Sequence, residues 1–154
     1  MPIEFHLPAD GRQSDPALRI ARGTRRLLRQ LGYASVQEIA LPSGLRADIL
    51  ALDANGELLI VEIKSSIQDF RTDQKWQGYG DHCDRFFFAV AVDFPADLIP
   101  ESAGLIVADP YGAAVIREAP FHRLAPATRK NMLLKFGYTA ADRLHHLWDR
   151  DRDG

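Results

Sequence analysis

The sequence predicts an α/β sandwich built around a mixed β-sheet. The chain has 154 residues, of which 46% are hydrophobic and 26% charged, so it can bury one core and is too apolar for a disordered chain. Helical spacing alternates with short apolar runs in the order helix, three strands, helix, strand, hairpin and further helices. We therefore expect a single domain over residues 15–148, with a flexible arm at 1–14 and a disordered tail at 149–154.

The first predicted helix runs from Asp15 to Gly32. It begins at Asp15-Pro16, because aspartate caps a helix and proline fits its first position, and glycine ends it. Its apolar side is formed by Ile20, Leu27, Leu28 and Leu31. A second side carries Arg19, Arg22, Arg25, Arg26 and Arg29. The helix is therefore expected to have a core face and a basic face.

Three strands are expected next, at Tyr33–Ala40, Leu45–Leu52 and Glu57–Lys64. The sequences Leu-Pro-Ser-Gly at 41–44 and Asp-Ala-Asn-Gly at 53–56 are typical of turns between strands. The three strands should therefore follow one another as a meander.

A second helix is predicted from Ile67 to His82, with Ser66 as its capping residue. The segment Arg85–Val92 is continuously apolar after its first residue, which is typical of a central strand covered on both faces. A hairpin is expected next, formed by Gly104–Ala108 and Ala113–Arg117. Two short helices are expected beyond Pro126, with a break between them near Gly137.

Three charged residues are expected to converge on the second and third strands. Glu62 and Lys64 are two residues apart and so share one face of their strand. Asp48 points to the same side if the two antiparallel strands pair with an even sum of residue numbers, as an odd-length connection such as 54–56 gives. Buried charge of this kind persists when a ligand, usually a metal ion, compensates it.

Magnesium, or manganese in its place, is the expected ion, because Mg²⁺ prefers hard oxygen ligands. Asp48, Glu62 and the backbone carbonyl of Ile63 are the candidate ligands. Such a site suits hydrolysis of a phosphodiester, in which Lys64 orients the attacking water or neutralises developing charge. The alternative is a surface pair of Glu62 and Lys64, with Asp48 capping a turn.

The pattern of Asp48 followed fourteen residues later by Glu62-Ile63-Lys64 resembles the PD-(D/E)xK nuclease superfamily. The segment VEIKSSIQDFRTDQKWQGYGDHCDRFFFAVA at 61–91 is similar to the MmcB family of bacterial DNA repair proteins, and the likeness covers most of the chain. The resemblance implies a restriction-endonuclease-like α-β-β-β-α-β sandwich and metal-dependent cleavage of DNA in repair. It makes Asp48 and Glu62 metal ligands and Lys64 the catalytic lysine.

Two features depart from the superfamily pattern. Ala47 stands where the signature has proline, and residues 16–31 contain no acid where many relatives place a metal-binding glutamate. A one-metal site, or a site without turnover, is compatible with this difference. A third acid could instead come from Asp69 or Asp73, although capping the helix is the competing role for Asp69.

Further contacts are expected around the second helix and on basic surfaces. Related nucleases place a lysine, glutamine or tyrosine beside the carboxylates, and serine can bond a phosphate, which makes accessory candidates of Ser66, Asp73, Lys75, Gln77 and Tyr79. Trp76 is expected in the core, and Cys83 as a buried thiol. DNA phosphates are predicted to contact the five arginines of the first helix, with a lesser extension through Arg123, Arg129, Lys130 and Lys135. The alternative for both sets is a solvated surface.

The net charge of −2 gives no overall attraction to DNA, so a local patch has to hold it. The single cysteine fits a reducing compartment, and no apolar run is long enough for a membrane span, so a cytoplasmic protein is expected. No glycine-rich loop indicates a nucleotide cofactor. A homodimer and a monomer acting beside a partner are both allowed. Three functions remain open: a metal-dependent deoxyribonuclease, a DNA-binding repair accessory without turnover, and a protein-interaction domain.

Overall fold

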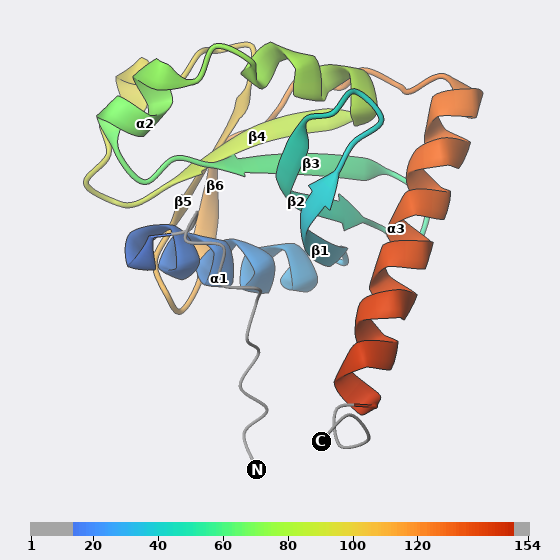
Figure 1. Cartoon of the computed structure of the whole chain (residues 1–154). Coiled ribbons are helices and arrows are strands. Elements are labelled where there is room, and N and C mark those ends of the chain that lie inside the picture. The colour runs from blue at the N-terminus through green and yellow to red at the C-terminus, as the bar shows by residue number, and fades with distance from the viewer. Residues whose placement is uncertain (1–13, 150–154) are drawn as a thin grey trace.

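The computed structural model describes residues 14–149, and it contains one six-stranded sheet in the order β1-β2-β3-β4-β5-β6 (Figure 1). The β1–β2, β2–β3 and β5–β6 pairs are antiparallel, whereas β3–β4 and β4–β5 are parallel. The predicted α/β fold with a mixed sheet is therefore confirmed. The strands are β1 (Ala34–Ala40), β2 (Arg46–Leu52), β3 (Leu58–Ile63), β4 (Arg85–Val90), β5 (Gly104–Ala108) and β6 (Ala113–Arg117). The helices are α1 (Asp15–Gln30), α2 (Ile67–Thr72), η1 (Trp76–His82), η2 (Ala96–Leu98) and α3 (Pro126–Trp148).

Helix α1 covers one face of the sheet, where Ile20 and Leu28 pack among the odd-numbered residues of β2 and β3 (Figure 1). Its capping residue is Ser14, whose Oγ accepts a hydrogen bond from the Ala17 amide at 3.4 Å. The prediction that Leu31 joins the core face was wrong, since this residue is 54% exposed. Leu31 already caps the helix, and Gly32 turns the chain with φ +90° into β1.

The opposite face is covered by α2, η1 and α3. Tyr79 from η1 and Met132 and Phe136 from α3 pack on the even-numbered residues of the central strands. Strand β4 begins at Arg85, as predicted, but it ends at Val90 and not at Val92. Each face of the sheet is thus covered by different helices. The even-numbered residues of β2 and β3, which include the candidate site residues, lie on the face covered by α2 and η1.

The predicted helix from Ile67 to His82 was wrong, because the segment forms α2 and the 3-10 helix η1 with three residues between them. The chain leaves the helix at Asp73, which has extended backbone angles and accepts the Lys75 amide on its side chain at 2.9 Å. The two glycines of η1, Gly78 and Gly80, each disfavour an α-helix by about 1 kcal/mol. Local side-chain bonding therefore replaces the continuous helix.

The prediction of two short helices after Pro126 was also wrong, since α3 runs without interruption to Trp148. Gly137 lies on the exposed side of the helix and costs about 1 kcal/mol there. Met132 and Phe136 are buried just before it, so packing against the sheet holds the helix through the glycine. The predicted arm at 1–14 lies outside the described residues apart from Ser14, and the predicted tail at 149–154 apart from Asp149, which caps α3.

Asp84, at the end of η1 and the start of β4, is a buried carboxylate that ties three segments together. It accepts hydrogen bonds from the amides of Leu58 at 2.8 Å and Leu124 at 2.9 Å. The guanidinium of Arg129 binds both of its oxygens, at 2.8 and 2.6 Å. Arg129 was predicted to extend a DNA-binding surface, and the structure shows it instead in this internal ion pair.

None of the helices among residues 14–149 combines the length and the apolar composition that crossing a bilayer requires.

Candidate active site

Strands β2 and β3 bring the predicted acidic pair together. Ile49 pairs with Val61, so Asp48 lies opposite Glu62 with an even sum of residue numbers, as the sequence predicted. The Asp48 amide donates to Glu62 Oε1 at 3.0 Å, and the Ile63 amide donates to Asp48 Oδ2 at 2.8 Å. Each carboxylate thus accepts a hydrogen bond from a backbone amide of the other strand, which sets the two acids side by side.

The acidic pair is largely removed from water. Glu62 is 6% exposed and Lys64 5%, while Asp48 is half-buried. They extend a face of the sheet that is otherwise apolar, with Leu50 and Ile60 as the next residues on the same side. A surface ion pair, the alternative reading of these residues, does not describe this environment.

Burial and mutual repulsion make it costly for both carboxylates to be ionised at once. Burial raises the pKa of Asp48, although the Ile63 amide opposes this shift. Burial first, and the charge of Asp48 second, raise the pKa of Glu62 to about 9. The pair therefore titrates as a unit and retains a proton at neutral pH unless a cation takes its place.

Lys64 is held beside this pair by two further acids. Its Nζ lies 2.8 Å from Asp73 Oδ2 and 3.8 Å from Asp69 Oδ1. Burial by itself would lower the lysine pKa, but the Asp73 hydrogen bond and the surrounding carboxylates outweigh it and raise the pKa. Lys64 is therefore a fixed ammonium ion, suited to stabilising negative charge and not to accepting a proton.

Asp69 and Asp73 are thus committed to positioning groups around Lys64. Asp69 Oδ2 accepts the Ser65 amide at 3.2 Å, and Asp73 Oδ1 accepts that of Lys75. Over residues 14–149 there is no cluster of three His, Cys, Asp or Glu side chains arranged to hold a metal ion. Sequence spacing offered Asp73 as a possible metal ligand but did not predict its contact with Lys64, because that contact depends on α2 ending at Thr72.

The donor set nevertheless fits a hard divalent cation. Two adjacent, largely buried carboxylates, whose simultaneous ionisation is unfavourable, match the one or two carboxylates that Mg²⁺ takes from proteins, beside water and substrate phosphate. The Ile63 amide lies against Asp48, and the carbonyl of Ile63 stays a predicted ligand.

The remaining accessory candidates are placed unequally. Tyr79 is buried against the site: its hydroxyl donates to the Arg46 carbonyl at 2.9 Å, and burial together with the charges of Glu62 and Asp48 raises its pKa. Ser66 caps α2 by accepting the Asp69 amide at 3.0 Å. Two further accessory candidates are exposed, Lys75 and Gln77, and their contact with a phosphate stays a prediction.

The five arginines of α1 do not join the acidic pair. They are exposed on the helix that covers the other face of the sheet, so the sheet separates them from Lys64 (Figure 1). Two of them contact neighbouring chain: Arg26 donates to the Tyr111 carbonyl at 3.2 Å and Arg25 to Ser35 Oγ at 3.4 Å. Helical spacing predicted the basic face, but it could not tell which side of the sheet carries the helix.

Replacing Glu62 by glutamine should stabilise the protein at alkaline pH. Because the folded-state pKa of Glu62 lies above the unfolded one, the contribution of this residue to stability is fully present below about pH 4.5 and is lost as pH rises toward 9. Glu62→Gln removes this loss and should raise the free energy of unfolding at pH 8 by about 1–2 kcal/mol, with little gain at pH 4.5. Denaturant unfolding without divalent ions measures the difference. Glu101→Gln, at an exposed position, is the control, and an equal gain at both pH values contradicts the assignment.

Comparison with known proteins identifies the family. A solved structure of the SPO1766 protein of unknown function from Silicibacter pomeroyi superposes with a TM-score of 0.86 at 47% identity, covering 90% of this chain and 95% of that one. No curated protein matches the sequence. A family model described as DNA repair protein MmcB-like matches residues 6–151. The chain with this paired-carboxylate site therefore belongs to the MmcB-like family of DNA repair proteins.

Proposed function

We propose that this protein is a deoxyribonuclease of DNA repair that depends on Mg²⁺ or Mn²⁺ and has the PD-(D/E)xK nuclease fold. The observation that carries the proposal is the buried contact of Asp48 with Glu62 beside the ammonium of Lys64. The order α1, β1, β2, β3, α2, β4 matches the α-β-β-β-α-β order that the resemblance implies. Membership of a DNA repair family supports DNA as the partner.

Each residue of the site has a defined task in this reaction. Asp48 and Glu62 would hold the ion, with the Ile63 carbonyl as the predicted third ligand. When bound, such an ion polarises a phosphate oxygen and lowers the pKa of a water molecule. Lys64 presents its positive charge where negative charge develops on the phosphate, and Asp73 keeps the ammonium in place. The lysine keeps its proton throughout, because its carboxylate neighbours stabilise the charged form.

The decisive experiment is a cleavage assay with the purified full chain. Single-stranded, duplex and branched DNA are incubated with Mg²⁺, with Mn²⁺, or with a chelator. We expect cleavage in either ion and none in the chelator. Absence of cleavage on all three substrates contradicts the nuclease proposal.

A DNA-binding accessory without turnover is the second candidate. It is favoured by the site's composition within residues 14–149, where two carboxylates form the ion site, since Asp69 and Asp73 are engaged with Lys64 and residues 16–31 supply no acid. In that case DNA binds in a salt-sensitive manner and stays intact with both ions. If the protein neither binds nor cleaves DNA, the remaining candidate is a protein-interaction domain.

The basic face of α1, formed by the five arginines, stays a predicted phosphate-binding surface. A DNA segment against Lys64 lies on the other face of the sheet, so the two surfaces contact different parts of a bound DNA. A homodimer likewise stays a prediction.

A further inference from the structure

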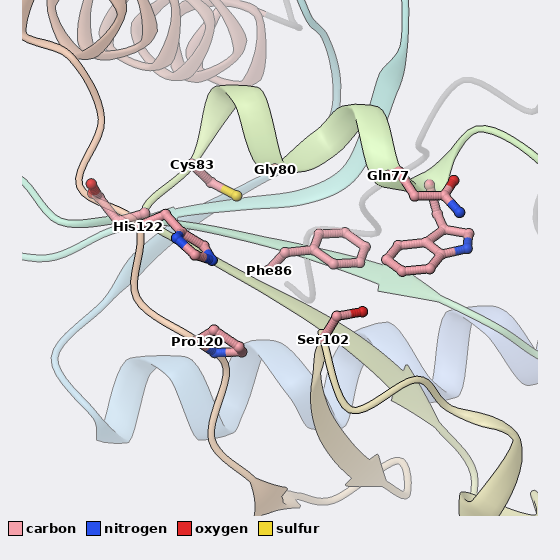
Figure 2. Close-up of a pocket in the computed structure, with 9 residues that line it drawn as sticks. Gln77, Gly80, Cys83, Phe86, Ser102, Pro120 and His122 are labelled. Carbon is pink, nitrogen blue, oxygen red and sulfur yellow. The ribbon is translucent and has the colours of Figure 1, made fainter.

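A pocket of about 250 Å³ lies beside η1, on the face of the sheet that carries the acidic pair (Figure 2). Phe86 and Pro120 contribute apolar surface, while Gln77, Ser102 and His122 contribute polar groups. In Figure 2 the ring of Phe86 lies between Ser102 and Pro120 on one side and, on the other, Gly80 of η1 and Cys83, which directly follows η1. The pocket thus combines a flat apolar wall with several hydrogen-bonding groups.

The strand register gives the distance between this pocket and the candidate active site. On β4, Phe88 pairs with Glu62 and Phe86 pairs with Ile60. The pocket wall is therefore two residues, roughly 7 Å, along the strand from the acidic pair. Trp76 links the two places, because its ring packs on Phe88 at 5.3 Å and stacks on Phe86 at 6.0 Å.

The same segment also connects the pocket to the lysine. Asp73 binds Lys64 and, through its other oxygen, the Lys75 amide, directly before Trp76. A DNA strand with a phosphate at Lys64 would thus have a neighbouring nucleotide within reach of the pocket.

The chemistry of the pocket suits one planar, polar, aromatic ring. Its volume is too small for a base pair or a helix. Phe86 is buried and stacks on Trp76 and Tyr79, whereas the half-buried ring of Trp76 lines the pocket and offers an aromatic surface on which a base can pack. The Gln77 amide donates and accepts, as does the Ser102 hydroxyl, which matches the mixed donors and acceptors on the edge of a base. The Asp84 carboxylate that also lines the pocket is neutralised by Arg129.

We propose that this pocket binds one unpaired nucleobase of the DNA strand held at Asp48, Glu62 and Lys64. The inference rests on the proposed function and specifies its substrate class. A base within a continuous duplex is stacked and paired and cannot enter, so the preferred DNA is single-stranded or has unpaired bases beside the reacting phosphate.

Blocking the pocket tests this proposal without any cleavage. Ser102 is exposed on the rim, so Ser102→Trp can fill the opening without replacing a core residue. Binding is measured in a chelator for short oligo(dT) and for an abasic strand of equal length. We expect the wild type to bind oligo(dT) about tenfold more tightly than the abasic strand, and Ser102→Trp to abolish that preference. Asn131→Trp, which puts the same ring at an exposed position on α3, should keep it.

Other results overturn the proposal. An unchanged preference for oligo(dT) in Ser102→Trp places base recognition elsewhere. If Ser102→Trp lowers the affinity for oligo(dT) and for the abasic strand equally, the substitution affects binding of the DNA backbone alone. If the wild type binds neither strand, DNA is not the ligand of this pocket. Far-UV circular dichroism and thermal unfolding confirm that the variants are folded.

The binding and cleavage assays separate this inference from the nuclease proposal. If Ser102→Trp abolishes the base preference but no DNA is cleaved, the pocket assignment stands and the protein is an accessory. If DNA is cleaved but single strands and duplexes react alike in both the wild type and Ser102→Trp, the nuclease stands and the pocket assignment fails.

Discussion

Replacing Lys64 by alanine is expected to slow metal-dependent DNA cleavage by about 10²- to 10³-fold, the usual effect of removing one preorganised charge-stabilising group. The Lys64 ammonium is buried and fixed by Asp73 at 2.8 Å, so water cannot substitute for it at low cost. Single-turnover cleavage at saturating Mg²⁺ measures the loss. The affinity for DNA should change far less than the rate, because a single charge is removed.

Two variants control the interpretation of the Lys64 result. Arg71→Ala removes an exposed positive charge from α2 and should cleave within a few-fold of the wild type. Asp48→Asn keeps an oxygen for the Ile63 amide but loses the charge that binds the ion, so it should abolish both cleavage and the heat of Mg²⁺ binding in calorimetry. A Lys64→Ala protein that cleaves at nearly the wild-type rate would show that the ammonium has no part in the reaction.

Asp84→Ala is expected to lower the free energy of unfolding by about 3–5 kcal/mol, the range for breaking a buried ion pair by removing one partner. The substitution leaves the Arg129 guanidinium and the buried amides of Leu58 and Leu124 without their acceptor. Denaturant unfolding at pH 7 measures the change. Asp81→Ala, at an exposed position three residues earlier, should cost less than 1 kcal/mol.

The same ion pair should contribute to acid denaturation. Burial by itself would raise the pKa of Asp84, but the Arg129 guanidinium and the backbone amides outweigh it and lower the pKa. The stabilisation is therefore present above about pH 3.8 and is lost as pH falls through the lower folded-state pKa. An Asp84→Ala protein that unfolds at the wild-type denaturant concentration would refute this account.

Much of the candidate site follows from short-range rules. Side chains alternate along a strand, and the odd-length connection at 53–57 determines how β2 pairs with β3, so the meeting of Asp48 with Glu62 could be predicted from spacing. The mixed sheet likewise follows from the order of apolar runs and turns. These patterns depend on residues close together in the chain, where local geometry leaves few alternatives.

Local sequence patterns were therefore sufficient to predict the mixed sheet, the acidic pair of Asp48 and Glu62, and the position of Lys64 beside this pair. Packing between distant segments decided that Asp73 binds Lys64, that Arg129 turns inward to Asp84, and that the arginines of α1 lie behind the sheet. Each of these outcomes depends on which distant segments pack together and exclude water. Burial determines how strong an ion pair is, and packing determines which side of a helix stays exposed. Periodicity within one segment carries no information about its distant neighbours.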